Sequence, residues 1–333
     1  MVMKKYAVVF VHGLAKKPSP AKLEEIWRWG LDRSDPPPPF AGNNPGIDLD
    51  VRGVPARFTY YADVFYGEDY ETEFDSFYES ESDAVVQEQN FDEVAGELVT
   101  PEPSNAEEVK FLEEVERKMQ QAPSPDEPPG LEALPAAHEP AQFEIASWLP
   151  SPVKQAVIKK AAMEAYYYLF DKDYVRPADG ARFKVRKELR DRLIRDLKAA
   201  RQEAEKVVLV THSMGTMIAY DVIRNCQECP NVDVLFTLGS PLGITEVQEQ
   251  LSAGGGKHVD FPPALRRWIN IYDPLDPICG ADPRMDDYAP FEGRSVEDVR
   301  ESNWGSWRHT VTHYFAGRLF RKLLAQALGL QHP

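Results

Sequence analysis

The chain of 333 residues lacks the features that define several large classes of protein. Its three cysteines are too few for a disulfide framework, so we expect a reducing, cytoplasmic setting. It has no run of 18 or more apolar residues, and we therefore expect no transmembrane segment. The apolar stretch behind Lys4 and Lys5 runs into His12-Gly13 without a small-residue cleavage site. That stretch therefore predicts a buried strand rather than a signal peptide.

Basic residues are scarce in one segment, and this accounts for the net charge of −16. Between Glu68 and Glu132 there are 21 acidic and three basic residues, which leaves the rest of the chain close to neutral. Because phosphate binding needs a basic surface, we expect no nucleic-acid partner. The acidic segment is either a solvated surface without a catalytic part or a docking site for a basic partner.

Apolar runs and amphipathic stretches alternate along the body of the chain. We predict strands at Tyr6–Val11, within Val51–Tyr66, and at Lys206–Val210, Val232–Leu238 and Trp268–Tyr272. We predict helices at Ala21–Leu31, Pro152–Phe170, Arg182–Ala204, Met214–Asn225 and Tyr314–Leu328. This alternation predicts an α/β fold with a mostly parallel central sheet and helices on both faces.

One long segment interrupts this alternation. Residues 68–150 are acidic and rich in proline, and only Glu107–Gln121 has the periodicity of a helix. We interpret 68–150 as an insertion that is partly disordered or forms a lid. Residues 1–67 and 151–333 are then the N-terminal and C-terminal parts of one core.

The strand predicted at Lys206–Val210 leads directly into Thr211-His212-Ser213-Met214-Gly215. A serine between small residues, on a sharp turn from a strand to a helix, is typical of a catalytic nucleophile. Its neighbours two positions away must be small so that the strand and the helix can approach each other. Gly215 meets this requirement fully, and Thr211 stands where glycine is usual. We therefore predict that Ser213 is a nucleophile.

The transition state of acyl transfer needs donors for its oxyanion. The N–H group of Met214, at the start of the predicted helix, is one candidate. The N–H group of Leu14, after the His12-Gly13 turn that ends the first strand, is the other. We expect His12 itself to be a structural residue of that loop.

A nucleophilic serine also needs a general base and a carboxylate that orients it. In the fold that carries its serine on such an elbow, the acid and then the histidine follow the serine in the chain. Asp273 and Asp276 both follow the strand at Trp268–Tyr272, in the turn where the acid belongs. We predict Asp276 as the acid, with Asp273 as second choice, because Asp273 can instead stabilise the turn through its side chain.

Four histidines follow the serine in sequence. His332 is at the C-terminus and His258 precedes the acid, so His309 and His313 are the candidates for the base. We favour His309, because Thr310 or Thr312 can then cap the last helix while the His309 ring stays in the loop. His313 falls in the first helical turn, where the helix dipole disfavours a protonated imidazole, and it is the second choice.

The remaining residues predict neither a cofactor nor a metal site. Cys226 and Cys229 have redox or metal spacing, but no second pair of ligands lies near them in the sequence. We interpret Cys279, just beyond the two aspartates, as a packing residue.

Four stretches together resemble the α/β-hydrolase superfamily, particularly its lipase-like and lipid-anchor-deacylase-like branches. They are Val9-Phe10-Val11-His12-Gly13, Val210–Gly215, Leu238-Gly239-Ser240-Pro241-Leu242-Gly243 and Tyr272-Asp273-Pro274-Leu275-Asp276-Pro277. Leu242 stands where lipases of this kind often carry histidine, and Glu68–Pro150 has no counterpart. The resemblance implies an α/β-hydrolase fold and hydrolysis through an acyl-enzyme, without a metal or organic cofactor.

We therefore expect a serine esterase that acts on a small-molecule or lipid ester through Ser213, Asp276 and His309. Transfer of the acyl group to another acceptor, or cleavage of a thioester, is an alternative that uses the same triad. A non-catalytic binding scaffold with the hydrolase fold is an alternative of another class.

Overall fold

The computed structural model describes residues 3–13, 16–34, 44–68, 70, 102–120, 152–252, 258–279, 282–304 and 308–330. Its centre is a six-stranded sheet in the order β2-β1-β5-β6-β7-β8, and each neighbouring pair of strands is parallel. The strands of this sheet are β1 (Lys4–Val11), β2 (Ala56–Thr59), β5 (Ala204–His212), β6 (Val232–Leu238), β7 (Leu265–Tyr272) and β8 (Val296–Arg300). A separate antiparallel hairpin joins β3 (Asp173–Val175) to β4 (Arg182–Lys184).

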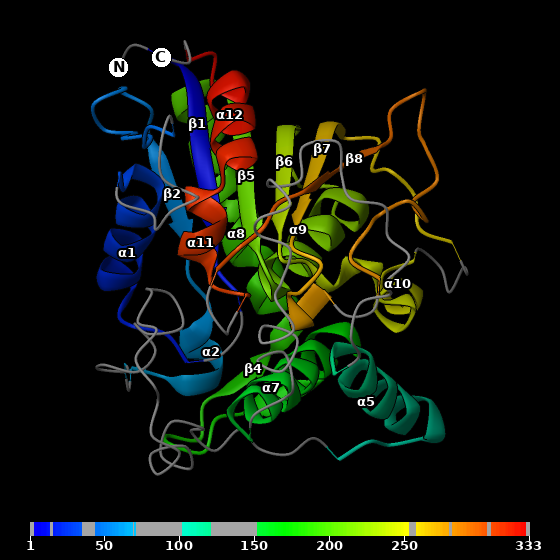
Figure 1. Ribbon diagram of the computed structural model, residues 1–333. Helices are drawn as coiled ribbons and strands as arrows, with labels where there is room; N and C mark the ends of the chain where they lie inside the picture. Colours follow the sequence, from blue (N-terminus) through cyan, green and yellow to red (C-terminus); the bar gives the residue numbers. More distant parts are fainter. Residues whose placement is uncertain are drawn as a thin grey trace.

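Helices cover both faces of the central sheet (Figure 1). One face carries α1 (Pro20–Asp32), α11 (Val311–Ala316) and α12 (Arg318–Ala327), and the other carries α8 (Val185–Glu203) and α9 (Met214–Asn225). The remaining helices are α2 (Ala62–Tyr66), α5 (Ala106–Met119), α7 (Pro152–Leu169) and α10 (Thr245–Leu251), with 3-10 turns η3 (Pro241–Gly243) and η5 (Pro277–Cys279). This arrangement confirms the predicted α/β fold.

The sheet separates two hydrophobic cores, as the alternation of side chains along a strand requires. In β1, Val8 and Phe10 point to the core under α1, α11 and α12. Val9 and Val11, between and beyond them, point to the larger core under α8 and α9. A strand that is buried on both faces must be apolar throughout, which explains the continuous apolar run of β1.

Helix α5 is the described part of the acidic segment, and it is packed against the body. Its Phe111 ring lies 5.1 Å from that of Phe170, edge to face, and Phe111 joins the larger core. The Glu108 carboxylate accepts from the hydroxyl of Tyr166 (2.6 Å) and from Lys172 (2.7 Å), and these donors lower its pKa to about 2. In Figure 1, α5 and α7 lie together at one end of the sheet. Residues 69, 71–101 and 121–150 lie outside the described residues, so the lid stays a prediction.

Several boundaries differ from the expected ones. The aromatic end of the predicted strand region, Tyr60–Val64, is not a strand, because helix α2 begins at Ala62. The stretch predicted as a last helix is divided at Gly317, whose φ/ψ of −61°/132° is not helical. The Glu301 carboxylate accepts the N–H groups of Leu319 and Phe320 there and so caps α12. Among the described residues, no helix is both long and apolar enough to cross a membrane.

Candidate active site

Ser213 connects the end of β5 to the start of α9 in an unusual backbone conformation. Its φ of 56° and ψ of −129° are sparsely populated by any residue other than glycine, and such strain costs about 1–3 kcal/mol. The surrounding structure supports this conformation. The Ser213 N–H donates to the Leu238 carbonyl (3.0 Å), and the Thr216 hydroxyl donates to the Ser213 carbonyl (2.6 Å). Strain of this kind is concentrated at functional sites.

The residues two positions from Ser213 meet the steric requirement of this turn in different ways. A methyl group on Gly215 would lie 2.5 Å from the His12 carbonyl oxygen and 2.8 Å from that of Val11, so only glycine fits. The hydroxyl of Thr211 donates to the Phe236 carbonyl on β6 at 2.8 Å. A threonine is therefore accommodated where glycine is usual, because it bonds to the neighbouring strand.

His309 and Asp276 form a buried pair. Nδ1 of His309 lies 2.8 Å and 3.0 Å from the two carboxylate oxygens of Asp276. Since a carboxylate accepts, Nδ1 carries the hydrogen, and in the neutral ring Nε2 has the free lone pair that a general base needs. Oδ1 of Asp276 also accepts from the Ile278 N–H (2.9 Å), and Oδ2 accepts from the Tyr314 hydroxyl (2.7 Å). The orientation of the carboxylate is therefore set from three sides.

The pair lies beside the turn that carries Ser213. The His309 ring stacks on the ring of His212, the residue before Ser213, with 4.4 Å between the ring centres. Gly239 follows Leu238, whose carbonyl accepts the Ser213 N–H. A methyl group on Gly239 would lie 2.7 Å from Oδ2 of Asp276 and 3.0 Å from Nδ1 of His309. Ser213 is fully buried, and its Oγ makes no hydrogen bond to any described residue. A bond from Oγ to His309 is thus not formed here.

The two second-choice residues have different surroundings. Asp273 accepts the N–H groups of Leu275 (2.8 Å) and Asn303 (2.7 Å), and burial raises its pKa to about 6. It therefore stabilises the turn, and no contact joins its carboxylate to His309 among the interactions of the described residues. His313 lies in the first turn of α11, stacked on Trp304 at 3.9 Å, and burial lowers its pKa to about 3.

The loop after β1 borders Ser213. A methyl group on Gly13 would lie 2.7 Å from Cβ of Ser213, so the backbone of this loop approaches the serine closely. Leu14, the predicted second oxyanion donor, lies outside the described residues. Met214 begins α9, and the first N–H groups of a helix have no partner within the helix, so its N–H is available to an oxyanion.

His12 holds the shape of this loop. Its Nε2 accepts the Tyr61 N–H (2.9 Å), so Nδ1 carries the hydrogen and donates to the Gly13 carbonyl (2.6 Å). The Tyr61 hydroxyl donates to the same carbonyl (2.9 Å), and its ring stacks on His12 at 4.0 Å. Burial lowers the pKa of His12 well below its usual value.

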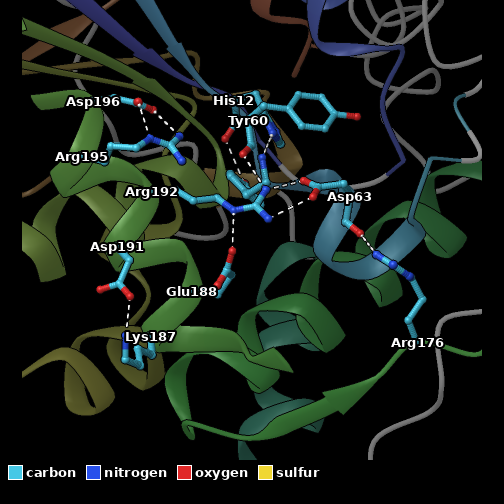
Figure 2. A network of polar contacts seen from close by, with 11 residues as sticks. His12, Tyr60, Asp63, Arg176, Lys187, Glu188, Asp191, Arg192, Arg195 and Asp196 are labelled. Atoms are coloured by element: carbon cyan, nitrogen blue, oxygen red, sulfur yellow. Dashed lines mark hydrogen bonds and ion pairs between the residues drawn. The ribbon is translucent and has the colours of Figure 1, made fainter. Parts of the chain in front are cut away.

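Arg192 of α8 contacts Tyr60 and Asp63, on either side of Tyr61 in the sequence, as Figure 2 shows. Its guanidinium pairs with Asp63 of α2 and donates to the Tyr60 carbonyl (3.0 Å), while its Nε donates to Glu188 (2.9 Å). Arg176 of the segment between β3 and β4 donates to the Asp63 carbonyl. This network ties α8 and the hairpin to Tyr60 and Asp63, on either side of Tyr61.

Cys226 and Cys229 are half-buried, and burial raises the pKa of Cys229 to about 12. A raised pKa disfavours the thiolate that redox or metal chemistry requires. Within the described ranges, no group of three or more His, Cys, Asp and Glu side chains is arranged to hold a metal ion.

No protein-family model matches the chain, and no curated protein is significantly similar to it. Function is therefore inferred from the residues and their geometry.

The sequence does not predict the contacts of three residues of the site. His212 lies inside the serine motif but at a position where many side chains fit. The spacing from His309 to Tyr314 resembles the last motif of the α/β-hydrolase superfamily, but it does not predict the hydrogen bond from Tyr314 to Asp276. Arg192 is one of many basic residues on α8, and only the folded chain brings it to Asp63.

Proposed function

We propose that the protein is a serine hydrolase of the α/β-hydrolase fold that cleaves carboxylic esters. The observation that carries this proposal is the strained conformation of Ser213 beside the buried pair of His309 and Asp276. A structural serine gains nothing from a left-handed backbone, whereas for a nucleophile this backbone places Oγ at the tip of the turn between strand and helix. The order of the strands also supports the proposal. β1 and β5 are neighbours in the sheet, so the loop after β1 and the serine turn after β5 follow neighbouring strands.

The reaction proceeds by acyl transfer. Nε2 of His309 takes the proton of the Ser213 hydroxyl while Oγ attacks the ester carbonyl carbon, and the Asp276 carboxylate stabilises the imidazolium. The N–H of Met214 donates to the oxyanion. The tetrahedral intermediate then expels the alcohol, which takes the proton from His309, and an acyl-enzyme on Ser213 is left. Water, deprotonated by His309, attacks this ester and releases the acid with Ser213 restored.

The test is hydrolysis of p-nitrophenyl esters from short to long acyl chains, with paired variants. Ser213→Ala should lower the rate by about 10⁶-fold, and Asp276→Asn should lower it by about 10³–10⁴-fold, as in other serine triads. Asp273→Asn is the matched control for the acid, and His313→Gln is the matched control for His309→Gln. Both controls should keep activity within a few fold of wild type.

Two results would contradict the proposal. Full activity in Ser213→Ala would exclude Ser213 as the nucleophile. No activity in a folded wild-type protein toward any acyl chain, together with no labelling by a fluorophosphonate, would favour the non-catalytic scaffold.

A further inference from the structure

Two buried polar atoms beside Gly13 have no hydrogen-bond partner among the described residues. They are Oγ of Ser213 and Nδ1 of His212. A methyl group placed on Gly13 would lie 3.3 Å from the first atom and 3.1 Å from the second, so both atoms lie against the same side of Gly13. Buried polar atoms are nearly always paired, because an unpaired one costs free energy. The mechanism uses Oγ of Ser213 but assigns nothing to Nδ1 of His212.

The role of this nitrogen follows from the other side of the ring. Nε2 of His212 lies 2.9 Å from the His309 carbonyl oxygen, which can only accept, so Nε2 carries the hydrogen. Burial and the neighbouring His309 and Lys17 lower the pKa of His212 well below its usual value, which keeps the ring neutral. Nδ1 therefore has a free lone pair and can only accept a hydrogen bond.

The ring is also held in place. His309 stacks on it at 4.4 Å with 30° between the ring planes, and the edge of Trp27 approaches at 6.4 Å. His212 is 3% exposed. The acceptor is thus fixed before any substrate arrives, as recognition of a single donor group requires.

We propose that Nδ1 of His212 recognises the substrate, by accepting a hydrogen bond from an acyl group that has a hydroxyl on the carbon next to its carbonyl. This inference rests on the proposed serine chemistry. The developing oxyanion cannot be the partner of Nδ1, because it also needs donors. In the acyl-enzyme, a substituent on the neighbouring carbon is three bonds from Oγ of Ser213, a reach that suits two atoms lying against the same side of Gly13. The expected substrates are therefore esters of 2-hydroxy acids.

The test compares kcat/KM for three p-nitrophenyl esters: 2-hydroxybutanoate, 2-fluorobutanoate and butanoate. Fluorine resembles the hydroxyl in size and withdraws electrons, but it donates no hydrogen bond. Each value is divided by the rate constant for hydroxide-catalysed hydrolysis of the same ester, which removes the difference in intrinsic reactivity. We expect the 2-hydroxy ester to exceed the 2-fluoro ester by roughly tenfold in the wild type.

His212→Phe keeps an aromatic ring against His309 but removes the acceptor. Loss of the bond to the His309 carbonyl should slow hydrolysis of all three esters, while the ratio of hydroxy to fluoro ester should fall to about one. Thr312→Val is the matched control. It removes a buried polar atom, the Thr312 hydroxyl, that likewise has no hydrogen-bond partner among the described residues, and it should keep the wild-type ratio.

A ratio of hydroxy to fluoro ester near one in the wild type, or an unchanged ratio in His212→Phe, would overturn this inference. If a fluorophosphonate still labels Ser213 in that case, the serine chemistry stands. Absence of both hydrolysis and labelling in the wild type would overturn the serine chemistry and the inference together.

Discussion

Replacing Tyr314 by phenylalanine removes a single hydroxyl from the candidate site. That hydroxyl donates to Oδ2 of Asp276 at 2.7 Å and accepts the Asp273 N–H at 3.2 Å. Burial and the nearby Asp276 raise the pKa of Tyr314, so the hydroxyl stays protonated and remains a donor. Oδ2 is also an acceptor for His309, so the change acts on the oxygen that orients the base.

The expected effect has two parts. A hydrogen bond to a charged group contributes about 1.5–3 kcal/mol, so the free energy of unfolding should fall by about that amount. Without the hydroxyl, the carboxylate keeps the Ile278 N–H on Oδ1 but loses the hydroxyl that holds Oδ2 toward His309. We expect kcat/KM to fall by roughly tenfold, far less than in Asp276→Asn, because the carboxylate itself remains.

The assay is ester hydrolysis together with urea unfolding, with Tyr168→Phe as control. Tyr168 is also fully buried and also donates to a carboxylate, Oδ2 of Asp221 at 2.6 Å, but this contact joins α7 to α9 and includes no residue of the candidate site. Tyr168→Phe should lose similar stability and keep wild-type kcat/KM. Equal loss of activity in both variants, or none in Tyr314→Phe, would refute the reasoning.

Three further predictions concern Gly239, Glu301 and Phe111. Gly239→Ala should lower activity strongly, because the new methyl group would lie 2.7 Å from Oδ2 of Asp276. Gly293 also has a positive φ (76°), but a methyl group on it would have nothing within 4 Å, so Gly293→Ala should lower stability and leave activity unchanged. Equal activities of the two variants would contradict this prediction. Burial raises the pKa of Glu301 from 4.5 to about 7, so the folded state binds the proton more tightly. Stability should then fall as pH rises from about 4.5 to about 7, by at most about 1.4 kcal/mol per pH unit from this group, and urea unfolding of Glu301→Gln should show a smaller slope. Phe111→Ala should cost about 3–5 kcal/mol in the same assay, and a loss below about 1 kcal/mol would show that α5 is not docked.

The sequence predicts the centre of the sheet well, and physical reasons explain where it fails. β1, β5 and β6 are buried on both faces, so their apolar runs are long and end at turns. β8 lies at the edge of the sheet, is only partly buried and has three charged residues among its five, so no apolar run marks it. The Tyr60–Val64 stretch has the composition of a strand but becomes helical, because the Tyr61 N–H donates to His12 instead of continuing the ladder.

The choice between the two aspartates shows the limit of sequence reasoning at the site. Asp273 and Asp276 both accept the N–H two residues further on, at 2.8 Å and 2.9 Å, so their local roles are the same. What separates them is tertiary: the second carboxylate oxygen of Asp273 accepts the Asn303 N–H, and that of Asp276 contacts His309. The spacing of residues contains no information about these distant partners.

The most direct test of the central claim is reaction of the folded protein with a fluorophosphonate, followed by peptide mass spectrometry. We predict a single adduct on the peptide that contains Ser213, no adduct in Ser213→Ala, and greatly slowed labelling in His309→Gln. An adduct on another residue, or a folded wild-type protein that takes no label, would contradict the assignment of Ser213 as an activated nucleophile.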